Sequence, residues 1–245
     1  MARGRGGRVN LTPLSDLWSA FTAAQPVPAP GLILATALVA LAAVGLPAVW
    51  RLSRNVITIT HEGGHALLAV LTGRRLRGIR LHSDTSGLTL ARGKPRGLGM
   101  VLTLSAGYVA PSLIGLAAAA VLATGRVTAL LWTALVLLTL VLVMIRNWFG
   151  LLSVTVTGAL VYLVSRYAAE QTQSAVAYTA VWFLLIGGVK PVLELRRRGR
   201  GGSSDPAQLA RVTGVPAVAW TVLFGLVTIA CLAYGGYVIL RGRVM

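Results

Sequence analysis

Residues 55–69 read Asn55-Val-Ile-Thr-Ile-Thr-His61-Glu62-Gly-Gly-His65-Ala-Leu-Leu-Ala69, an apolar stretch that carries three ionisable side chains. His61, Glu62 and His65 have the spacing H-E-x-x-H. If the stretch is helical, the two histidines lie one turn apart on one face, where their imidazoles can share a zinc ion and the glutamate can reach a water bound to it. Because histidine and glutamate are rare in this chain, chance would produce the pattern only about 0.0005 times. The spacing therefore predicts a helix that binds zinc.

The rest of the chain has the composition of a membrane protein. Of 245 residues, 56% are hydrophobic and 12% are charged, whereas about 25% of residues are charged in a soluble domain. Runs as long as the hydrocarbon core is thick recur along the sequence, and they cover residues 31–50, 55–72, 97–123, 127–145, 147–165, 174–193 and 215–240. The second run is marginal because it contains the ionisable motif. We predict an all-α polytopic membrane protein with six or seven transmembrane helices.

The charge balance bears on topology. Lys and Arg number 23 against 6 Asp and Glu, a ratio that on a soluble fold would indicate nucleic-acid binding. Here the basic residues punctuate apolar runs, so we expect the lipid bilayer and no nucleic acid as partner. With seven spans and a cytoplasmic N-terminus, 17 basic residues fall inside and six outside, as the positive-inside rule requires. We therefore predict a multi-pass protein of the cell membrane, with residues 1–29 as an N-terminal cytoplasmic arm that lacks a signal-peptide pattern.

Two segments between the apolar runs have their own character. Over residues 74–96, apolar and polar residues alternate on either side of a turn at Ser83 to Gly87, which is typical of a β-hairpin. We place this hairpin at the cytoplasmic surface after the zinc helix. Residues 194–214 form a second predicted cytoplasmic loop, with a basic Gly/Ser stretch at 196–204.

Two histidines leave a catalytic zinc site one protein ligand short. The single cysteine, Cys231, excludes a site built from several thiolates and an internal disulfide. Asp16 falls in the N-terminal arm and Glu170 on the predicted outer side. The residues left on the side of the hairpin are His82, Asp84, Glu194 and Asp205.

Each of these candidates also fits an ordinary structural role. Asp84 lies in the hairpin turn, where aspartate commonly bonds to its own backbone, and Glu194 precedes a run of arginines with which it can pair. Asp205 is followed by Pro206 and, three positions on, by Gln208, the pattern of an N-cap at a helix start. Residue patterns favour the cap for Asp205 and leave the third ligand open.

Three segments resemble the site-2 protease family of membrane-embedded zinc metallopeptidases, and more closely its small bacterial branch. They are residues 55–69, the hairpin at 73–90, and Ser105-Ala-Gly107-Tyr108-Val-Ala-Pro111-Ser112. The likeness covers about residues 50–220. It implies His61 and His65 as zinc ligands and Glu62 as general base, and it raises Asp205, in the segment 204–216, as the third ligand. Site-2 proteases usually supply that ligand from an Asn-Pro…Asp-Gly motif, and no Asp-Gly occurs here.

Tyr108 belongs to the third of these segments. Its hydroxyl can donate a hydrogen bond to a substrate carbonyl or to the oxyanion that develops from it, while its neighbours are small residues that suit close packing against the zinc helix. We retain both roles for Tyr108, substrate binding and packing.

Together these features predict a zinc metalloendopeptidase, with residues 30–245 as its transmembrane domain, that hydrolyses peptide bonds of membrane-protein or peptide substrates in or next to the bilayer. The alternative is a non-proteolytic zinc-binding scaffold that binds partner membrane proteins. A transporter is disfavoured because intramembrane acids are scarce. High Ala, Val, Leu, Gly and Arg with little Lys suits a GC-rich bacterial source.

Overall fold

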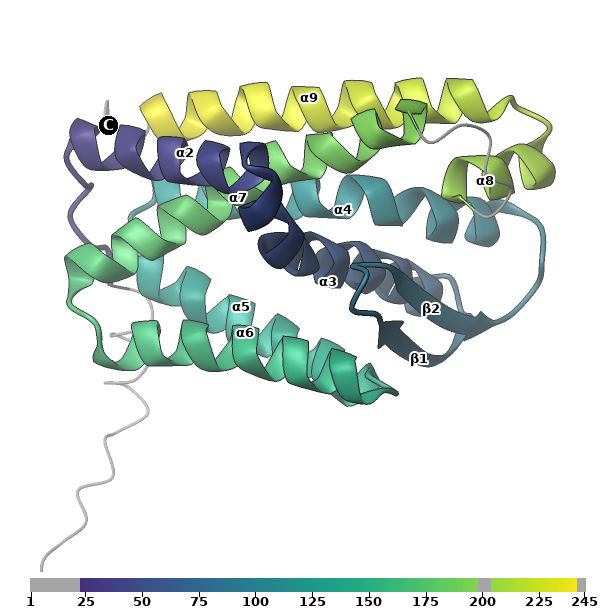
Figure 1. Cartoon of the computed structure of the whole chain (residues 1–245), viewed down its shortest axis with the longest axis horizontal. Helices are drawn as coiled ribbons and strands as arrows, with labels where there is room; N and C mark the ends of the chain where they lie inside the picture. The colour runs from purple at the N-terminus through teal and green to yellow at the C-terminus, as the bar shows by residue number, and fades with distance from the viewer. Residues whose placement is uncertain (1–22, 198–203, 242–245) are drawn as a thin grey trace, which may run out of the picture.

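The chain folds into long helices that run side by side, with one small sheet at one end of the bundle (Figure 1). The computed structural model describes residues 23–197 and 204–241. The elements are α2 (Pro30–Gly45), α3 (Pro47–Leu71), β1 (Arg75–Leu81), β2 (Gly87–Arg92), α4 (Leu98–Ala123), α5 (Val127–Met144), α6 (Trp148–Tyr167), α7 (Glu170–Arg197), α8 (Asp205–Thr213) and α9 (Ala217–Arg241). The predicted all-α polytopic class with a β-hairpin is confirmed.

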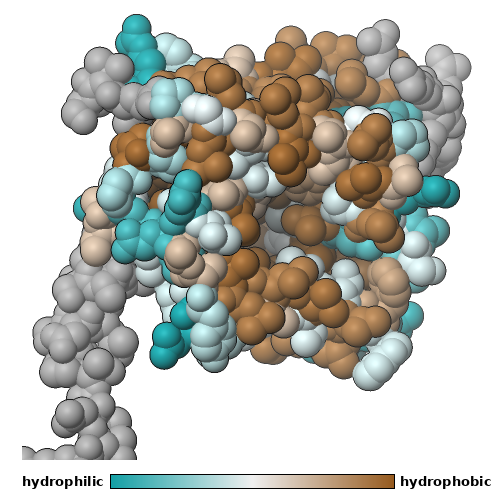
Figure 2. Space-filling view, turned by 60° about the vertical axis from the view of Figure 1, so that its left-hand side comes forward, coloured by the Kyte–Doolittle hydropathy of each residue, from teal (hydrophilic) through white to brown (hydrophobic). Residues whose placement is uncertain are grey.

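Within the described residues, five helices are long and apolar enough to cross a membrane, namely α4, α5, α6, α7 and α9. Helices α2 and α3 meet that criterion only together, and they are bent by 101° where they join. Counting them as one broken span gives six, the lower of the two predicted numbers. Figure 2 shows apolar side chains over much of the surface of the bundle, as expected for helices that face acyl chains.

The break between α2 and α3 is stabilised from α7. The amine of Lys190 donates a hydrogen bond to the carbonyl of Val44, in the last turn of α2, and lies 4.6 Å from the ring centre of Trp50. A cation at a helix C-terminus interacts favourably with the partial negative charge there, and Pro47 opens α3 without needing a donor partner. A lysine near the end of an apolar run is expected to extend to the surface, but Lys190 points to this break.

The two ends of α5 show which segments lie at the same end of the bundle. The N–H of Gln25 donates to the carbonyl of Gly125, just before α5, whereas β1 contacts Ile145, just after it. Residues 23–29 and the hairpin therefore lie at opposite ends of the bundle (Figure 1). The prediction that the arm and the hairpin are both cytoplasmic counts two spans between them, whereas α2 and α3 meet the criterion for a span only as one bent pair. The first 22 residues of the arm lie outside the described part.

The hairpin runs back along α3 from its C-terminal end. Its strands are antiparallel, with Ile79 opposite Thr89 and Leu81 opposite Gly87. Ile79 and Leu81 are buried in a cluster that includes Ile59 of α3. Near the tip, the hydroxyl of Thr58 donates to the carbonyl of Thr85, at 2.9 Å. These contacts hold the hairpin alongside the face of α3 that carries the histidines.

Candidate functional site

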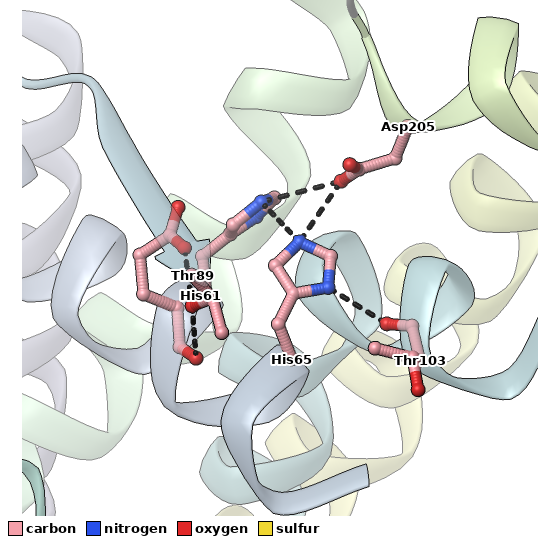
Figure 3. A network of polar contacts seen from close by, with 6 residues as sticks. His61, His65, Thr89, Thr103 and Asp205 are labelled. Atoms are coloured by element: carbon pink, nitrogen blue, oxygen red, sulfur yellow. Dashed lines mark hydrogen bonds and ion pairs between the residues drawn. The ribbon is translucent and has the colours of Figure 1, made fainter. Parts of the chain in front are cut away.

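The structure brings three predicted metal ligands together from two helices. His61 and His65 lie one turn apart on α3, and Asp205 is the first residue of α8. The two Nε2 atoms are 3.1 Å apart, and Oδ2 of Asp205 lies 3.3 Å from Nε2 of His61 and 3.1 Å from Nε2 of His65 (Figure 3). In the described part of the chain, these three residues form the only group of His, Cys, Asp or Glu side chains with this geometry.

The three facing atoms suit a cation. Nδ1 of His65 lies 2.7 Å from the carbonyl of Thr103, and because a carbonyl only accepts, Nδ1 carries a proton and Nε2 is the ring nitrogen that can bind a metal. Oδ2 of Asp205 is buried, and among the described residues its partners are the two imidazoles alone. Zinc bonds of about 2.0–2.1 Å in a tetrahedron give ligand separations of about 3.3 Å. The observed distances fit that ion.

Asp205 does not cap α8. The N-cap residue is Ser204, so the helix begins at Asp205, one position earlier than the capping pattern predicts, and the carboxylate of Asp205 faces the histidines. Burial raises the pKa of the Asp205 carboxyl, but its contacts with His61 and His65 outweigh burial and hold the pKa below its ordinary value. The carboxyl is therefore ionised at neutral pH, the form that binds a metal.

The competing candidates are engaged elsewhere. Asp84 is exposed and accepts hydrogen bonds from the N–H and the hydroxyl of Ser86, which lower its pKa. The hydroxyl of Ser86 also lies 3.3 Å from Nδ1 of His82. Glu194 forms an ion pair with Arg54, at 3.0 Å. The geometry thus separates Asp205 from the other candidates that the sequence left open.

Glu62 is buried between the metal ligands and the hairpin, with 4% of its surface exposed. The hydroxyl of Thr89 donates to Oε2 of Glu62, at 2.6 Å, and also lies 3.1 Å from its main-chain carbonyl. Gly87 packs so closely that a Cβ there would lie 2.5 Å from Oε1. The second strand therefore fixes the carboxylate of Glu62 both by a hydrogen bond and by contact.

Helix α4 covers the histidines from the other side. A Cβ at Gly107 would lie 2.3 Å from Nε2 of His65 and 2.6 Å from Nε2 of His61, so only glycine leaves room for both rings. The next residue, Tyr108, meets His61 edge to face at 4.8 Å and stacks on Phe224 at 5.7 Å. The structure thus places the predicted substrate-binding tyrosine beside a predicted ligand.

A cavity of about 380 Å³ opens at this group. Its lining includes the three predicted ligands and Glu62, and also Tyr108, Arg54 of α3, and Leu88, Thr89 and Ala91 of β2. Thr89, Thr103 and Arg54 were not predicted as site residues. Period-two alternation places Thr89 on a strand, but nothing in the sequence pairs it with Glu62 across 27 positions.

A comparison with families of known proteins identifies the family of the chain. A family model described as Peptidase M50B-like matches residues 34–235 of the 245. No curated protein and no solved structure matches the chain. The matched range begins in α2, contains α3, the hairpin and Asp205, and ends in α9. Six candidate spans, a His-His-Asp group and a match over most of the chain lead to one assignment: the chain belongs to the Peptidase M50B-like family, a site-2 protease family of membrane metallopeptidases.

Proposed function

We propose that the protein is a membrane-embedded zinc metalloendopeptidase that cleaves peptide bonds of membrane-protein or peptide substrates in or next to the bilayer. The observation that carries this proposal is the convergence of His61, His65 and Asp205 within 4.8 Å of one another, with Glu62 beside them. His61 and His65 would bind zinc through Nε2 and Asp205 through Oδ2. Zinc held there lowers the pKa of a bound water to about 7 and polarises a carbonyl.

Glu62 is the general base in this proposal. Its carboxylate accepts the proton of the attacking water and delivers a proton to the leaving amine. The hydrogen bond from Thr89 occupies Oε2, so it restricts the rotation of the carboxylate and leaves the other oxygen for proton transfer. Burial of Glu62 keeps bulk water from competing for that oxygen.

The open edge of β2 supports binding of an extended substrate. In the described sheet β2 pairs with β1 alone, and Leu88, Thr89 and Ala91 line the cavity. A helical amide is hydrogen-bonded within its helix, so a peptide must be extended before its carbonyl can be attacked. Pairing with β2 would satisfy the backbone of that extended segment. Tyr108, whose ring meets that of His61 edge to face, would donate to the carbonyl that is attacked.

Charge favours the hairpin end as the cytoplasmic one. The exposed basic residues at that end include Arg75, Arg77, Arg80, Arg92, Lys94, Arg96, Arg146 and Arg211. Those at the opposite end of the described bundle are Arg126, Arg166 and Arg241. By the positive-inside rule the site opens near the cytoplasm and residues 23–29 lie on the outer side. We propose the bacterial cell membrane as the location.

Isosteric removal of the base tests the function. Wild-type protein in lipid nanodiscs should bind one zinc per chain and cleave a pool of internally quenched peptides, or a co-expressed single-span membrane protein. Glu62→Gln should keep the zinc and lose cleavage by more than about a hundredfold, since general-base catalysis contributes 10²- to 10⁴-fold. Glu170→Gln, an identical change at an exposed position at the other end of the bundle, should cleave normally.

Two outcomes would count against the proposal. Cleavage by Glu62→Gln at the wild-type rate would remove Glu62 from the mechanism. Zinc binding without any turnover in the wild-type protein would favour the alternative, a scaffold that binds membrane proteins without cutting them.

A further inference from the structure

Three hydrogen bonds join the turn between α5 and α6 to the outer edge of β1. The carboxamide of Asn147 makes two of them with one residue: its Nδ2 donates to the carbonyl of Leu81, at 2.6 Å, and its Oδ1 accepts from the N–H of Leu81, at 3.1 Å. The N–H of Arg146 donates to the carbonyl of Ile79, at 2.9 Å. Asn147 thus satisfies both main-chain groups of Leu81, as a residue of a neighbouring strand would.

The side chain of Asn147 does not cap the helix that follows it. Asn147 is the N-cap residue of α6, and asparagine is among the residues preferred there because its oxygen can accept from the first free N–H groups of a helix. Its side chain makes no such cap bond. Helix α6 therefore lacks a side-chain cap, and the carboxamide forms its hydrogen bonds with β1 instead.

The close approach of the turn to β1 depends on two glycines. Gly78 has a φ of +150°, and a Cβ there would lie 2.3 Å from Cγ of Arg146. A Cβ at Gly150 would lie 2.8 Å from Oδ1 of Asn147. Ile79 and Leu81 are themselves almost fully buried, with 0% and 1% of their surfaces exposed. The contact of Arg146 and Asn147 with Ile79 and Leu81, called the joint below, is therefore closely packed.

The strand register connects the turn, through β1 and β2, to the proposed base Glu62. Ile79 is paired with Thr89, and Leu81 is paired with Gly87. Thr89 and Gly87 are the two residues of β2 that hold Glu62, one by a hydrogen bond and one by contact. Each β1 residue bound by the turn thus lies directly opposite a β2 residue that touches the base.

We propose that Asn147 is a positioning residue of the active site. By completing the outer edge of β1, it fixes the hairpin so that Thr89 and Gly87 hold Glu62 and the open edge of β2 faces the cavity. This inference rests on the proposed function, because it assigns Asn147 to the geometry of the same reaction.

Asn147→Asp is the sharpest test. It keeps the shape of the side chain and an equally favoured N-cap residue, but it replaces the donor to Leu81 with an acceptor. We expect kcat for the quenched-peptide pool to fall about ten- to hundredfold, the loss that accompanies an unpaired buried polar group, with a smaller rise in KM. Zinc content should stay at one per chain, and hydrogen exchange should accelerate at the amides of β1 and β2 but not in α9.

Two further variants accompany it. Asn147→Ser also favours an N-cap but is too short to reach both groups of Leu81, so it should reproduce the loss of kcat. Trp148→Phe, at the adjacent residue with 76% of its surface exposed, should behave as the wild type in every measurement.

The proposal is overturned if Asn147→Asp leaves kcat and hairpin exchange unchanged, or if both Asn147 variants lose zinc and lower the Tm, which would make the residue a general folding contact. Failure of the proposed function looks different. In that case the wild-type protein binds zinc and cleaves nothing, while faster hairpin exchange in Asn147→Asp still supports the joint and unchanged exchange still overturns it.

Discussion

Oδ2 of Asp205 lies 3.1 Å from Nε2 of His65 although four helices separate α8 from α3 along the described chain. The short helix α8 brings the carboxylate there, with Leu209 buried against α4 and α9 in a cluster with Leu104 and Phe224. The candidate metal site is thus completed by tertiary packing of α8, at a distance in sequence that local patterns do not span.

Zinc content should identify the third ligand. Asp205→Ala should weaken zinc binding by more than about a hundredfold, because loss of an outer-shell partner alone costs 10- to 100-fold. Glu194→Gln should bind zinc as the wild type does, since Glu194 pairs with Arg54 away from the histidines. Metal analysis of protein dialysed against a weak chelator provides the measurement. Equal retention by Asp205→Ala would exclude Asp205 as a ligand.

Gly107→Ala should abolish the metal-binding geometry, although it adds only one methyl group. The added Cβ would stand 2.3 Å from Nε2 of His65, well inside van der Waals contact, so a ring must move and the ligand geometry is lost. Gly158→Ala is the matched control on α6, where a Cβ meets nothing within 4 Å. It should keep zinc and leave Tm unchanged or higher, since alanine is favoured over glycine in a helix by about 1 kcal/mol. Zinc binding by Gly107→Ala at wild-type affinity would contradict this picture.

The sequence predicted those features that depend on local periodicity. The spacing of His61 and His65 placed both on one helix face, and alternation over residues 74–96 indicated the hairpin. The number of spans is harder to predict, because α2 is 16 residues long and ends at a bend where its last turn accepts a hydrogen bond from Lys190, a residue far along the chain. Hydropathy windows do not register such a bend, so they do not show that residues 23–29 and the hairpin lie at opposite ends of the bundle.

Side-chain contacts between distant segments could not be predicted from the sequence, because local patterns do not determine them. Asp205 had a satisfactory local role as a helix cap, so its pattern alone favoured the wrong function. Thr89 and Asn147 are polar residues of a strand and a turn whose partners, Glu62 and Leu81, are fixed by hairpin register and by helix packing. Only the folded geometry shows that α3, the hairpin and the turn between α5 and α6 meet.

Thr89→Val should slow the reaction without removing the metal. Valine keeps the branched shape and strand preference of threonine but cannot donate to Oε2 of Glu62. We expect kcat to fall about ten- to hundredfold, because a hydrogen bond to a charged group is worth about 1.5–3 kcal/mol, while the zinc content stays unchanged. Thr89→Ser, which retains the hydroxyl, should recover most of the activity. A Ser variant as slow as the Val variant would show that packing and not the hydrogen bond matters.

Cysteine labelling should place the two ends of the bundle on opposite sides of the membrane. Lys94, beside the hairpin, and Thr124, between α4 and α5, are both exposed. Each can be replaced by a single cysteine in a Cys231→Ala background, which removes the native thiol. Because α4 is long enough to span, an impermeant maleimide applied to intact cells should label Thr124→Cys and spare Lys94→Cys until the cells are opened. The direction follows from the excess of basic residues around the hairpin. Labelling of both cysteines from outside would show that α4 does not cross the bilayer, and the reverse pattern would place the active site on the outer face.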